Sequence, residues 1–331
     1  MDKRGVIAEI ESFVTSKLNL LAPVESAWQP SDFVPDLRSE ESFVQLKNLR
    51  SAAAELPDEV LIVLVGTMVT EEALPSYQTF LNRLDGMRDD TGASATPWAQ
   101  WSRGWTAEEN RHGDLLNRYL YLSGRVDMRA VETTIHHLIR NGFDPLPCND
   151  PYMGLVYTSF QERATRISHT RVGQLARRSG EPALAKLCNV IAGDEARHEE
   201  AYKSFMGRIW EIDPAGAMIA FATMLKHRIV MPASLMSDGK DDDLFANFAA
   251  VAQKIGVYTF PDYIDIMEHL IALWNVPNIT GLKDAAAAAQ DRICRLPELY
   301  RRQMNKVVAT KSAPVRFQFP WITAPSEIVR G

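Results

Sequence analysis

The chain has 331 residues, of which 46% are hydrophobic and 24% charged, and its formal net charge is −6. This composition is typical of a folded globular protein, and the negative charge argues against nucleic acid as a partner. Three scattered cysteines are too few for a disulfide framework, and no uninterrupted apolar run approaches the roughly 20 residues that span a bilayer. We therefore expect a soluble protein of a reducing compartment, with no membrane segment.

The N-terminal part of the chain begins with an amphipathic segment and then becomes rich in proline. Residues 1–35 predict a short helix followed by an extended strap over 19–35, which contains Pro23, Pro30 and Pro35. The opening residues lack the features of a secretion signal or a transit peptide, so either no targeting segment exists or a processed form begins at a new Met1. From 58 to 88 the residues predict one long, apolar helix with a kink at Pro75.

Helical periodicity continues through most of the remaining chain. It predicts helices at 96–122, 127–140, 152–178, 181–212, 215–228, 243–255, 261–274 and 282–306. Alternating apolar residues occur in the tail, 312–331, at Val315, Phe317, Phe319 and Trp321, where a small β-hairpin would suit them. No linker or low-complexity tract interrupts the chain, so residues 1–331 predict one all-α domain with four long central helices.

The strongest functional signal is the spacing Glu-x-x-His, which occurs twice, as Glu109 with His112 and as Glu195 with His198. Residues three apart on a helix lie on neighbouring faces, so a carboxylate and an imidazole can reach the same ion. Of the seven histidines, these two alone follow a glutamate by three residues. One such pair would more often lie on an exposed helix surface, but two pairs together favour metal binding.

Each motif is preceded by a further glutamate on the previous long helix. Glu71 lies 38 residues before Glu109, and Glu162 lies 33 residues before Glu195. Both follow apolar stretches, and a carboxylate buried there is costly unless it is paired, protonated or bound to a metal. Four helices that supply Glu, Glu-x-x-His, Glu and Glu-x-x-His are typical of ferritin-like bundles that hold two metal ions.

Charge and ligand type indicate which ions would suit this set. Four carboxylates and two neutral imidazoles carry four negative charges, which balance two divalent ions. The mixed oxygen and nitrogen ligands favour iron or manganese over a structural zinc. The adjacent Glu72 and Glu108 each point about 100° away from their neighbours, so we expect them to be solvated or salt-bridged.

The residues around these motifs resemble the plant acyl-ACP desaturase family, and stearoyl-ACP desaturases in particular. The matching runs are 70–75 (TEEALP), 105–116 (WTAEENRHGDLL), 159–165 (SFQERAT) and 194–199 (DEARHE). The resemblance extends from 23 to 297 and so covers nearly the whole chain. It implies a homodimeric enzyme of the plastid stroma that takes electrons from ferredoxin and uses O₂ at two iron ions per subunit. Such an enzyme forms a double bond in an acyl chain carried by acyl carrier protein (ACP).

The resemblance also implies roles for individual residues. The implied iron ligands are Glu71, Glu109, His112, Glu162, Glu195 and His198. Thr165 would lie beside the oxygen-binding side of the centre, although a helix threonine often hydrogen-bonds only to a carbonyl one turn earlier. Asp194 would hold an imidazole tautomer in place. Trp28 would lie on the electron route from the surface, unless it serves as a packing anchor.

The same resemblance indicates an apolar substrate channel past the metal ions. Its candidate residues are Tyr77, Phe80, Arg83, Met231, Pro232, Phe245 and Ala246, and the apolar ones would equally suit an ordinary core. Because the carrier is acidic, we expect basic residues near the channel mouth, with Arg83 and the run from Lys226 to Arg228 as candidates. Arg83, Ala246 and Thr67 depart from the stearoyl pattern. These departures lead us to predict palmitoyl-ACP Δ4 desaturation, with stearoyl-ACP Δ9 desaturation as the alternative.

Two further functions are open from the ligand set alone. A ferritin-like iron oxidase or oxygen-reducing protein would use the same six side chains without an organic substrate. A non-enzymatic partner of the acyl carrier would keep the fold and lose the chemistry, but the intact ligand set argues against it. Iron analysis together with acyl product formation separates these functions from a desaturase.

Overall fold

The computed structural model describes residues 2–146, 148–309 and 318–322, and these ranges are mostly helical. The α-helices are α1 (Lys3–Glu9), α2 (Glu11–Lys17), α3 (Glu41–Ala54), α4 (Asp58–Glu72), α5 (Leu74–Asn82), α6 (Pro97–Ser123), α7 (Met128–Asn141), α8 (Pro151–Arg178), α9 (Pro182–Ile212), α10 (Pro214–His227), α11 (Leu244–Lys254), α12 (Phe260–Leu273) and α13 (Asp284–Ala309). Short 3₁₀ turns lie at Leu18–Leu20, Pro30–Asp32, Pro232–Leu235 and Val276–Asn278. Within the described ranges, β-type pairing is limited to an isolated bridge between Val126 and Ile322, so the all-α prediction is confirmed.

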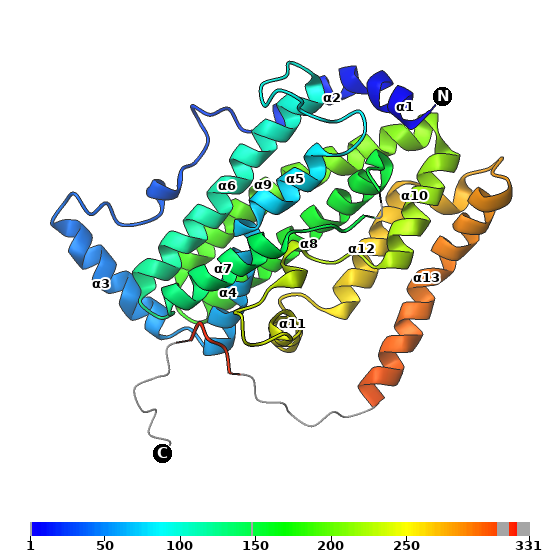
Figure 1. Ribbon diagram of the computed structural model, residues 1–331. Helices are drawn as coiled ribbons and strands as arrows, with labels where there is room; N and C mark the ends of the chain where they lie inside the picture. The colour runs from blue at the N-terminus through cyan, green and yellow to red at the C-terminus, as the bar shows by residue number, and fades with distance from the viewer. Residues whose placement is uncertain (1, 147, 310–317, 323–331) are drawn as a thin grey trace.

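Four long helices, α4, α6, α8 and α9, form the centre of the molecule, and α8 and α9 pack side by side (Figure 1). Helix α4 packs against α6 and α8, and α6 also contacts α9, so the four helices enclose a common interior. Outer helices cover this bundle: α10 and α12 lie on α8, α7 and α11 on α4, and α2, α3 and α5 on α6. The predicted helices from 96 to 306 agree with the structure to within a few residues at each end.

Helix α4 is buried on every side. All residues from Val60 to Glu71 are buried, as expected for a helix that carries apolar residues around its whole circumference. Together with α5 it forms a stretch, Asp58–Asn82, that is long and apolar enough to cross a membrane, because its most apolar 18-residue window has a mean hydropathy of 1.3. Because 78% of its most apolar window is buried inside the protein, this stretch has the environment of a core helix.

The predicted single helix over 58–88 is wrong in one respect that affects the site. The chain leaves the helix at Ala73, and α5 begins at Leu74 with Pro75 in its first turn. Proline suits that position because the first-turn N–H groups of a helix have no intrahelical partner. Helix α5 ends at Asn82, before the predicted end. As a result, Glu71 lies in the last turn of α4 instead of the middle of a longer helix.

Helix α3 was not predicted from the sequence. It buries Ser42, Leu49 and Ala53 and leaves Phe43 and Val44 exposed, so it lacks the apolar stripe that marks an amphipathic helix. The strap over 19–35 contains no α-helix, but it is not extended throughout: the 3₁₀ turn Leu18–Leu20 overlaps its start and the turn Pro30–Asp32 lies within it. This strap carries Trp28 across α6, which the second of these turns contacts.

The predicted C-terminal hairpin lies largely outside the described residues, since Val315 and Phe317 belong to the range that is not described. The described segment 318–322 packs against the start of α7 instead. Phe319 and Trp321 are buried, and the indole Nε1 of Trp321 donates to Thr134 Oγ1 at 2.9 Å. The backbone N–H of Asp127 donates to the carbonyl of Trp321 at 2.7 Å. This segment therefore covers one end of α7.

Candidate metal centre

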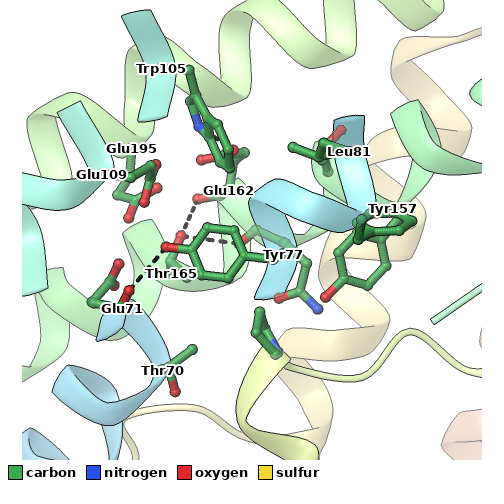
Figure 2. Close-up of a pocket in the computed structure, with 14 residues that line it drawn as sticks. Thr70, Glu71, Tyr77, Leu81, Trp105, Glu109, Tyr157, Glu162, Thr165 and Glu195 are labelled. Carbon is green, nitrogen blue, oxygen red and sulfur yellow. Dashed lines mark hydrogen bonds between the residues drawn. The ribbon is translucent and has the colours of Figure 1, made fainter. Parts of the chain in front are cut away.

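The four central helices bring six ionisable side chains together in the interior. They are Glu71 from α4, Glu109 and His112 from α6, Glu162 from α8, and Glu195 and His198 from α9. They form two overlapping groups, each of which has its ligand atoms within 4.8 Å of one another, and all six are buried. Figure 2 shows the four glutamates converging from their separate helices. Every ligand candidate predicted from the sequence therefore lies in one cluster.

Glu109 and Glu195 lie between the two halves of the cluster and belong to both groups. Glu109 places Oε2 3.5 Å from His112 Nδ1 and Oε1 2.8 Å from His198 Nδ1. Glu195 Oε1 lies 3.5 Å from His112 Nδ1. The remaining glutamates lie at the ends: Glu71 Oε2 is 3.9 Å from His112 Nδ1, and Glu162 Oε2 is 3.6 Å from His198 Nδ1. The cluster therefore has two carboxylates at its middle and one at each end, and this set could hold a pair of ions.

Several atoms of the cluster have no well-directed hydrogen-bond partner among the described residues. They are Glu109 Oε1, Glu195 Oε1, His112 Nδ1 and His198 Nδ1, and all four are buried. Buried polar atoms without partners are costly, and such atoms facing a common point are what a bound cation would satisfy. The donor set of four carboxylates and two imidazoles therefore fits a centre with two divalent metal ions.

The electrostatics of the cluster favour positive charge at its middle. Burial raises the pKa of Glu71 and of Glu162. Burial alone would also raise the pKa of Glu109, but His112 and His198 lower it to about 2. Conversely, burial alone would lower the pKa of His112, yet Glu109 and the other carboxylates around it raise that pKa well above its ordinary value. Metal ions and protons therefore compete for the same carboxylates and imidazoles, so metal binding should release protons.

The outward nitrogens of the two histidines are bound by acids from the opposite motif. His112 Nε2 lies 3.3 Å from Asp194 Oδ2, and His198 Nε2 lies 2.9 Å from Glu108 Oε2. Asp194 is where the sequence predicted such a residue. Glu108 was expected to be solvated or salt-bridged. It does accept from Arg197 at 2.9 Å, but it is buried, and its contact with His198 was not predicted. Glu108 and Asp194 are the first residues of a repeated acid-Glu-x-Arg-His pattern, which is the signal that would have found Glu108.

Trp28 links the strap to this network. Its ring stacks on that of His112, with centroids 6.1 Å apart and planes 11° from parallel. Its Nε1 donates to Asp194 Oδ2 at 3.1 Å, and the Arg111 guanidinium lies 4.4 Å from its ring centroid. Trp28 is half-buried, so it reaches from near the surface to a proposed metal ligand.

Thr165 lies one turn after Glu162 and hydrogen-bonds to carbonyls of the preceding turn, as many helix threonines do. Its Oγ1 donates to the carbonyls of Gln161 and Glu162, each at 3.1 Å. It also lines both of the cavities that adjoin the cluster. Its position beside the centre agrees with the sequence prediction, while a role in oxygen chemistry stays a prediction.

Two cavities meet at Thr70, Glu71 and Thr165. The inner cavity, of about 50 Å³, is lined by the glutamate cluster, Trp105 and apolar residues of α5 and α8. The outer cavity, of about 530 Å³, extends from Glu71 to a rim with the exposed residues Arg228 and Phe260. Its walls are mainly apolar, and its size is that of a typical small-molecule pocket. An elongated apolar ligand can therefore reach the cluster from the surface.

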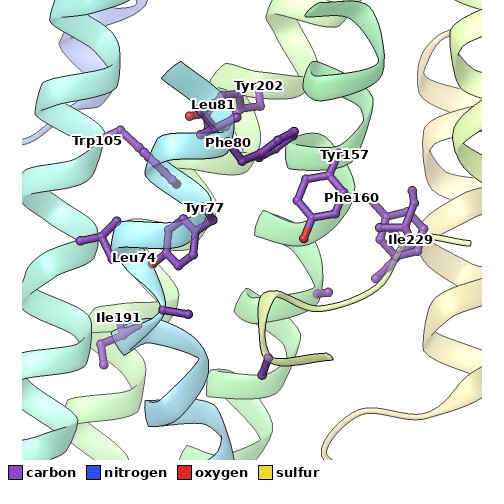
Figure 3. Close-up of a cluster of buried hydrophobic side chains, with 14 of the residues drawn as sticks. Leu74, Tyr77, Phe80, Leu81, Trp105, Tyr157, Phe160, Ile191, Tyr202 and Ile229 are labelled. Carbon is purple, nitrogen blue, oxygen red and sulfur yellow. The ribbon is translucent and has the colours of Figure 1, made fainter. Parts of the chain in front are cut away.

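The structure brings five of the seven predicted channel residues to these cavities. Tyr77, Phe80 and Pro232 line the inner cavity, and Met231 and Phe245 line the outer one. Figure 3 shows the side chains of Tyr77, Phe80 and Tyr157 grouped in this region, where the rings of Phe80 and Tyr157 meet edge to face at 5.5 Å.

The other two predicted channel residues, Arg83 and Ala246, line neither cavity. Arg83 is drawn away by an ion pair with Asp144, just beyond the end of α5. Ala246 faces the solvent on α11, where the turn of the helix points Phe245 and Phe248 inward. Neither residue therefore lines the two cavities, and a role for them in substrate binding stays a prediction.

Comparison with known proteins agrees with this geometry. A sequence model of the family described as "Fatty acid desaturase" matches residues 2–323. The chain belongs to the fatty acid desaturase family. It is therefore an oxidoreductase, and the resemblance noted from its motifs is confirmed.

Several relatives cover most of this fatty acid desaturase chain. A chloroplastic acyl-ACP desaturase of Cucumis sativus is 52% identical over 97% of this chain and 81% of its own length. Stearoyl-ACP 9-desaturase 1 of Arabidopsis thaliana is 54% identical over 92% of this chain and 78% of its own. An acyl-ACP 6-desaturase of Thunbergia alata is 52% identical over 92% and 79%. The X-ray structure of DesA2 of Mycobacterium tuberculosis, described as a candidate acyl-ACP desaturase, shares the fold, with a TM-score of 0.55 and 19% identity over 86% of this chain and 99% of that one.

Proposed function

We propose that this protein introduces a double bond into a fatty acyl chain carried by ACP, with O₂ as oxidant and two iron ions bound by Glu71, Glu109, His112, Glu162, Glu195 and His198. The observation that carries this proposal is that the four glutamates of the six-residue cluster line the inner cavity, while Glu71 also lines the larger, mainly apolar outer one. The relatives' names, which specify acyl-ACP substrates, support the substrate class. When bound, the iron pair would supply the O₂ chemistry that removes two hydrogens from the chain.

The protein's own residues would hold the acyl chain and exclude water. The outer cavity, of about 530 Å³, would hold the acyl chain, and the inner one, of about 50 Å³ and walled in part by Tyr77 and Trp105, leaves little room for solvent. The indole Nε1 of Trp105 donates to Glu162 Oε1 at 3.0 Å, so the same side chain holds a proposed ligand and bounds the cavity. Positioning one segment of a flexible chain beside the centre is how such a site would select the carbons that react.

We also propose that electrons enter through Trp28 from ferredoxin. The stacking of Trp28 on His112, together with their shared contact to Asp194, provides a short connected route from the strap to the centre. Exchange of Trp28 for leucine should leave iron content unchanged and slow reduction of the enzyme by ferredoxin. A matched rate of reduction in the two proteins would count against this route.

For the position of the double bond, the names of the relatives do not favour the predicted Δ4. The stearoyl-ACP 9-desaturases of Olea europaea and Arabidopsis thaliana are 51% and 54% identical to this chain, and the acyl-ACP 6-desaturase of Thunbergia alata is 52% identical. Of the three departures that motivated Δ4, Arg83 and Ala246 do not line the cavities, whereas Thr67 lines the outer one. We therefore propose stearoyl-ACP Δ9 desaturation as at least as well supported as palmitoyl-ACP Δ4 desaturation.

One experiment tests both levels of the proposal. The iron-loaded full chain is incubated with ferredoxin, a reducing system, O₂ and either 16:0-ACP or 18:0-ACP, and the double bond is located by mass spectrometry. We expect an unsaturated product from the native chain, none from Glu162→Ala, and a product from Glu132→Ala, an exposed glutamate of α7. Iron uptake and O₂ consumption without any acyl product would favour the iron-oxidase function instead.

Three further expectations are proposals of the same kind. Several relatives are named chloroplastic, which supports residence in the plastid, and we propose the stroma as the compartment. We propose a homodimer, which light scattering of the purified protein would test. We also propose that residues 1–331 form one ferritin-like domain, which a single cooperative unfolding transition would support.

A further inference from the structure

His169 is a buried histidine that belongs neither to the Glu-x-x-His motifs nor to the proposed ligands. It lies on α8 seven residues after Glu162, and seven residues are close to two helical turns, so both side chains lie on the same face of α8. Its Nε2 lies 2.8 Å from Glu71 Oε1, and its ring centroid is 6.5 Å from that of His112. His169 therefore contacts the opposite half of the cluster from its helix neighbour Glu162.

Glu71 needs such a partner because of its place in α4. It lies in the last turn, where the helix dipole presents its negative end and disfavours a carboxylate. Burial of the carboxylate adds to this cost. The interactions found for its carboxylate among the described residues are the hydrogen bond with His169 and the 3.9 Å approach of His112. Without His169, the side chain would lose its one directed contact.

Glu162, the carboxylate at the other end of the cluster, is held by a hydrogen bond from an indole instead of an imidazole. Glu162 uses Oε1 to accept from Trp105 Nε1 and turns Oε2 toward His198. Glu71 uses Oε1 to accept from His169 Nε2 and turns Oε2 toward His112. Each terminal glutamate therefore has one oxygen bound to a ring N–H and one oxygen directed at the centre.

We propose that His169 is a positioning residue that fixes the orientation of Glu71, so that Oε2 is presented to one metal ion of the centre. This inference rests on the proposed function, which makes Glu71 a ligand, and it adds a residue that the motifs do not contain. His169 Nδ1 is buried without a hydrogen-bond partner among the described residues, so within that part of the chain the ring hydrogen-bonds through Nε2. The role needs an N–H donor at this point, not a charge.

The test measures metal binding to the metal-free full chain with Co²⁺ as the probe. We expect the native protein to bind two ions, and His169→Leu to bind one of them about 10- to 100-fold more weakly, as is typical when a group that orients a ligand is lost. His169→Gln places an amide N–H near the position of Nε2 and should recover most of this affinity. His136→Leu, the same change at an exposed histidine of α7, should bind both ions normally.

A spectroscopic measurement separates positioning from a merely structural role. In protein loaded with ⁵⁷Fe, the Mössbauer signal of one iron site should change in His169→Leu, and Trp105→Phe should change the other. Two unchanged signals and unchanged affinities in His169→Leu would overturn the inference. An equal loss at both sites, together with a lower unfolding temperature of the metal-free protein that His169→Gln does not restore, would also overturn it. Native protein that fails to bind two ions would refute the proposed function itself.

Discussion

Replacing Asp194 with asparagine should weaken metal binding without changing the shape of the side chain. Asp194 accepts from Trp28 Nε1, Arg111 Nη2 and His112 Nε2 at 3.1, 3.1 and 3.3 Å, and from Arg197 Nη2 at 2.8 Å. An asparagine keeps one acceptor oxygen and turns an NH₂ group toward donors. His112 then loses the anion that holds its Nε2 proton and keeps Nδ1 free for a metal.

The expected size of this effect follows from the contact of Asp194 with His112, a proposed ligand, because Asp194 would act on the ions only through that imidazole. Loss of such a contact typically lowers metal affinity by 10- to 100-fold, which corresponds to about 1.4 to 2.7 kcal/mol. Titration of the metal-free protein with Co²⁺ measures it directly. Glu108→Gln, which changes the equivalent contact of His198, should affect the second ion to a similar extent, whereas Asp114→Asn, in an exposed ion pair with Arg118, should affect neither.

Unchanged affinity for both ions in Asp194→Asn would refute this reasoning, because the acid would then not govern the imidazole. The pH dependence provides a second check. Burial would raise the pKa of Asp194, but His112 and Arg197 lower it below the ordinary range. A lowered pKa means that the carboxylate stabilises the fold above about pH 4, its ordinary pKa, and that this contribution is lost as the pH falls further. The stability difference between native and Asp194→Asn protein should therefore shrink in acid.

Three other changes test the fold and the cavities. Asp262→Asn removes a bidentate pair with Arg171 and part of the N-terminal cap of α12, so it should lower the free energy of unfolding by about 2 to 4 kcal/mol at pH 7 in denaturant unfolding. Burial would raise the pKa of Asp262, but hydrogen bonds from Arg171 and Thr259 lower it, so the difference in stability between native and variant protein should diminish below about pH 4. In Gly66→Ala the new Cβ would lie 2.2 Å from the Phe248 ring. The ring must then move, which should cost about 1 to 3 kcal/mol and alter the ratio of turnover with 18:0-ACP and 16:0-ACP; an unchanged ratio and stability would contradict a tight wall at this point. Removal of metal by a chelator should lower the unfolding temperature, since ions at 100 times their dissociation constant contribute about 2.7 kcal/mol of stability per site. Equal unfolding temperatures with and without chelator would show that the ions do not bind the folded cluster.

The sequence alone was sufficient for the four central helices and for six side chains that meet between them. Within a helix, the spacing of residues determines which face they share, so Glu109 with His112 and Glu195 with His198 had to lie on common faces. The apolar surroundings of Glu71 and Glu162 then indicated that they point to the same interior. In the structure these six side chains lie together in one compact cluster, and their role as metal ligands stays a proposal.

Contacts between different helices depended on the packing and were not visible in the spacing. Glu108 reaches His198, and His169 reaches Glu71, because α6 and α8 bring these side chains opposite helices that are distant in sequence. Arg83 fell outside the cavities because α5 ends before it and Asp144 attracts its guanidinium. Periodicity determines which residues of one helix share a face, and only the packing of several helices decides which residues from different helices touch.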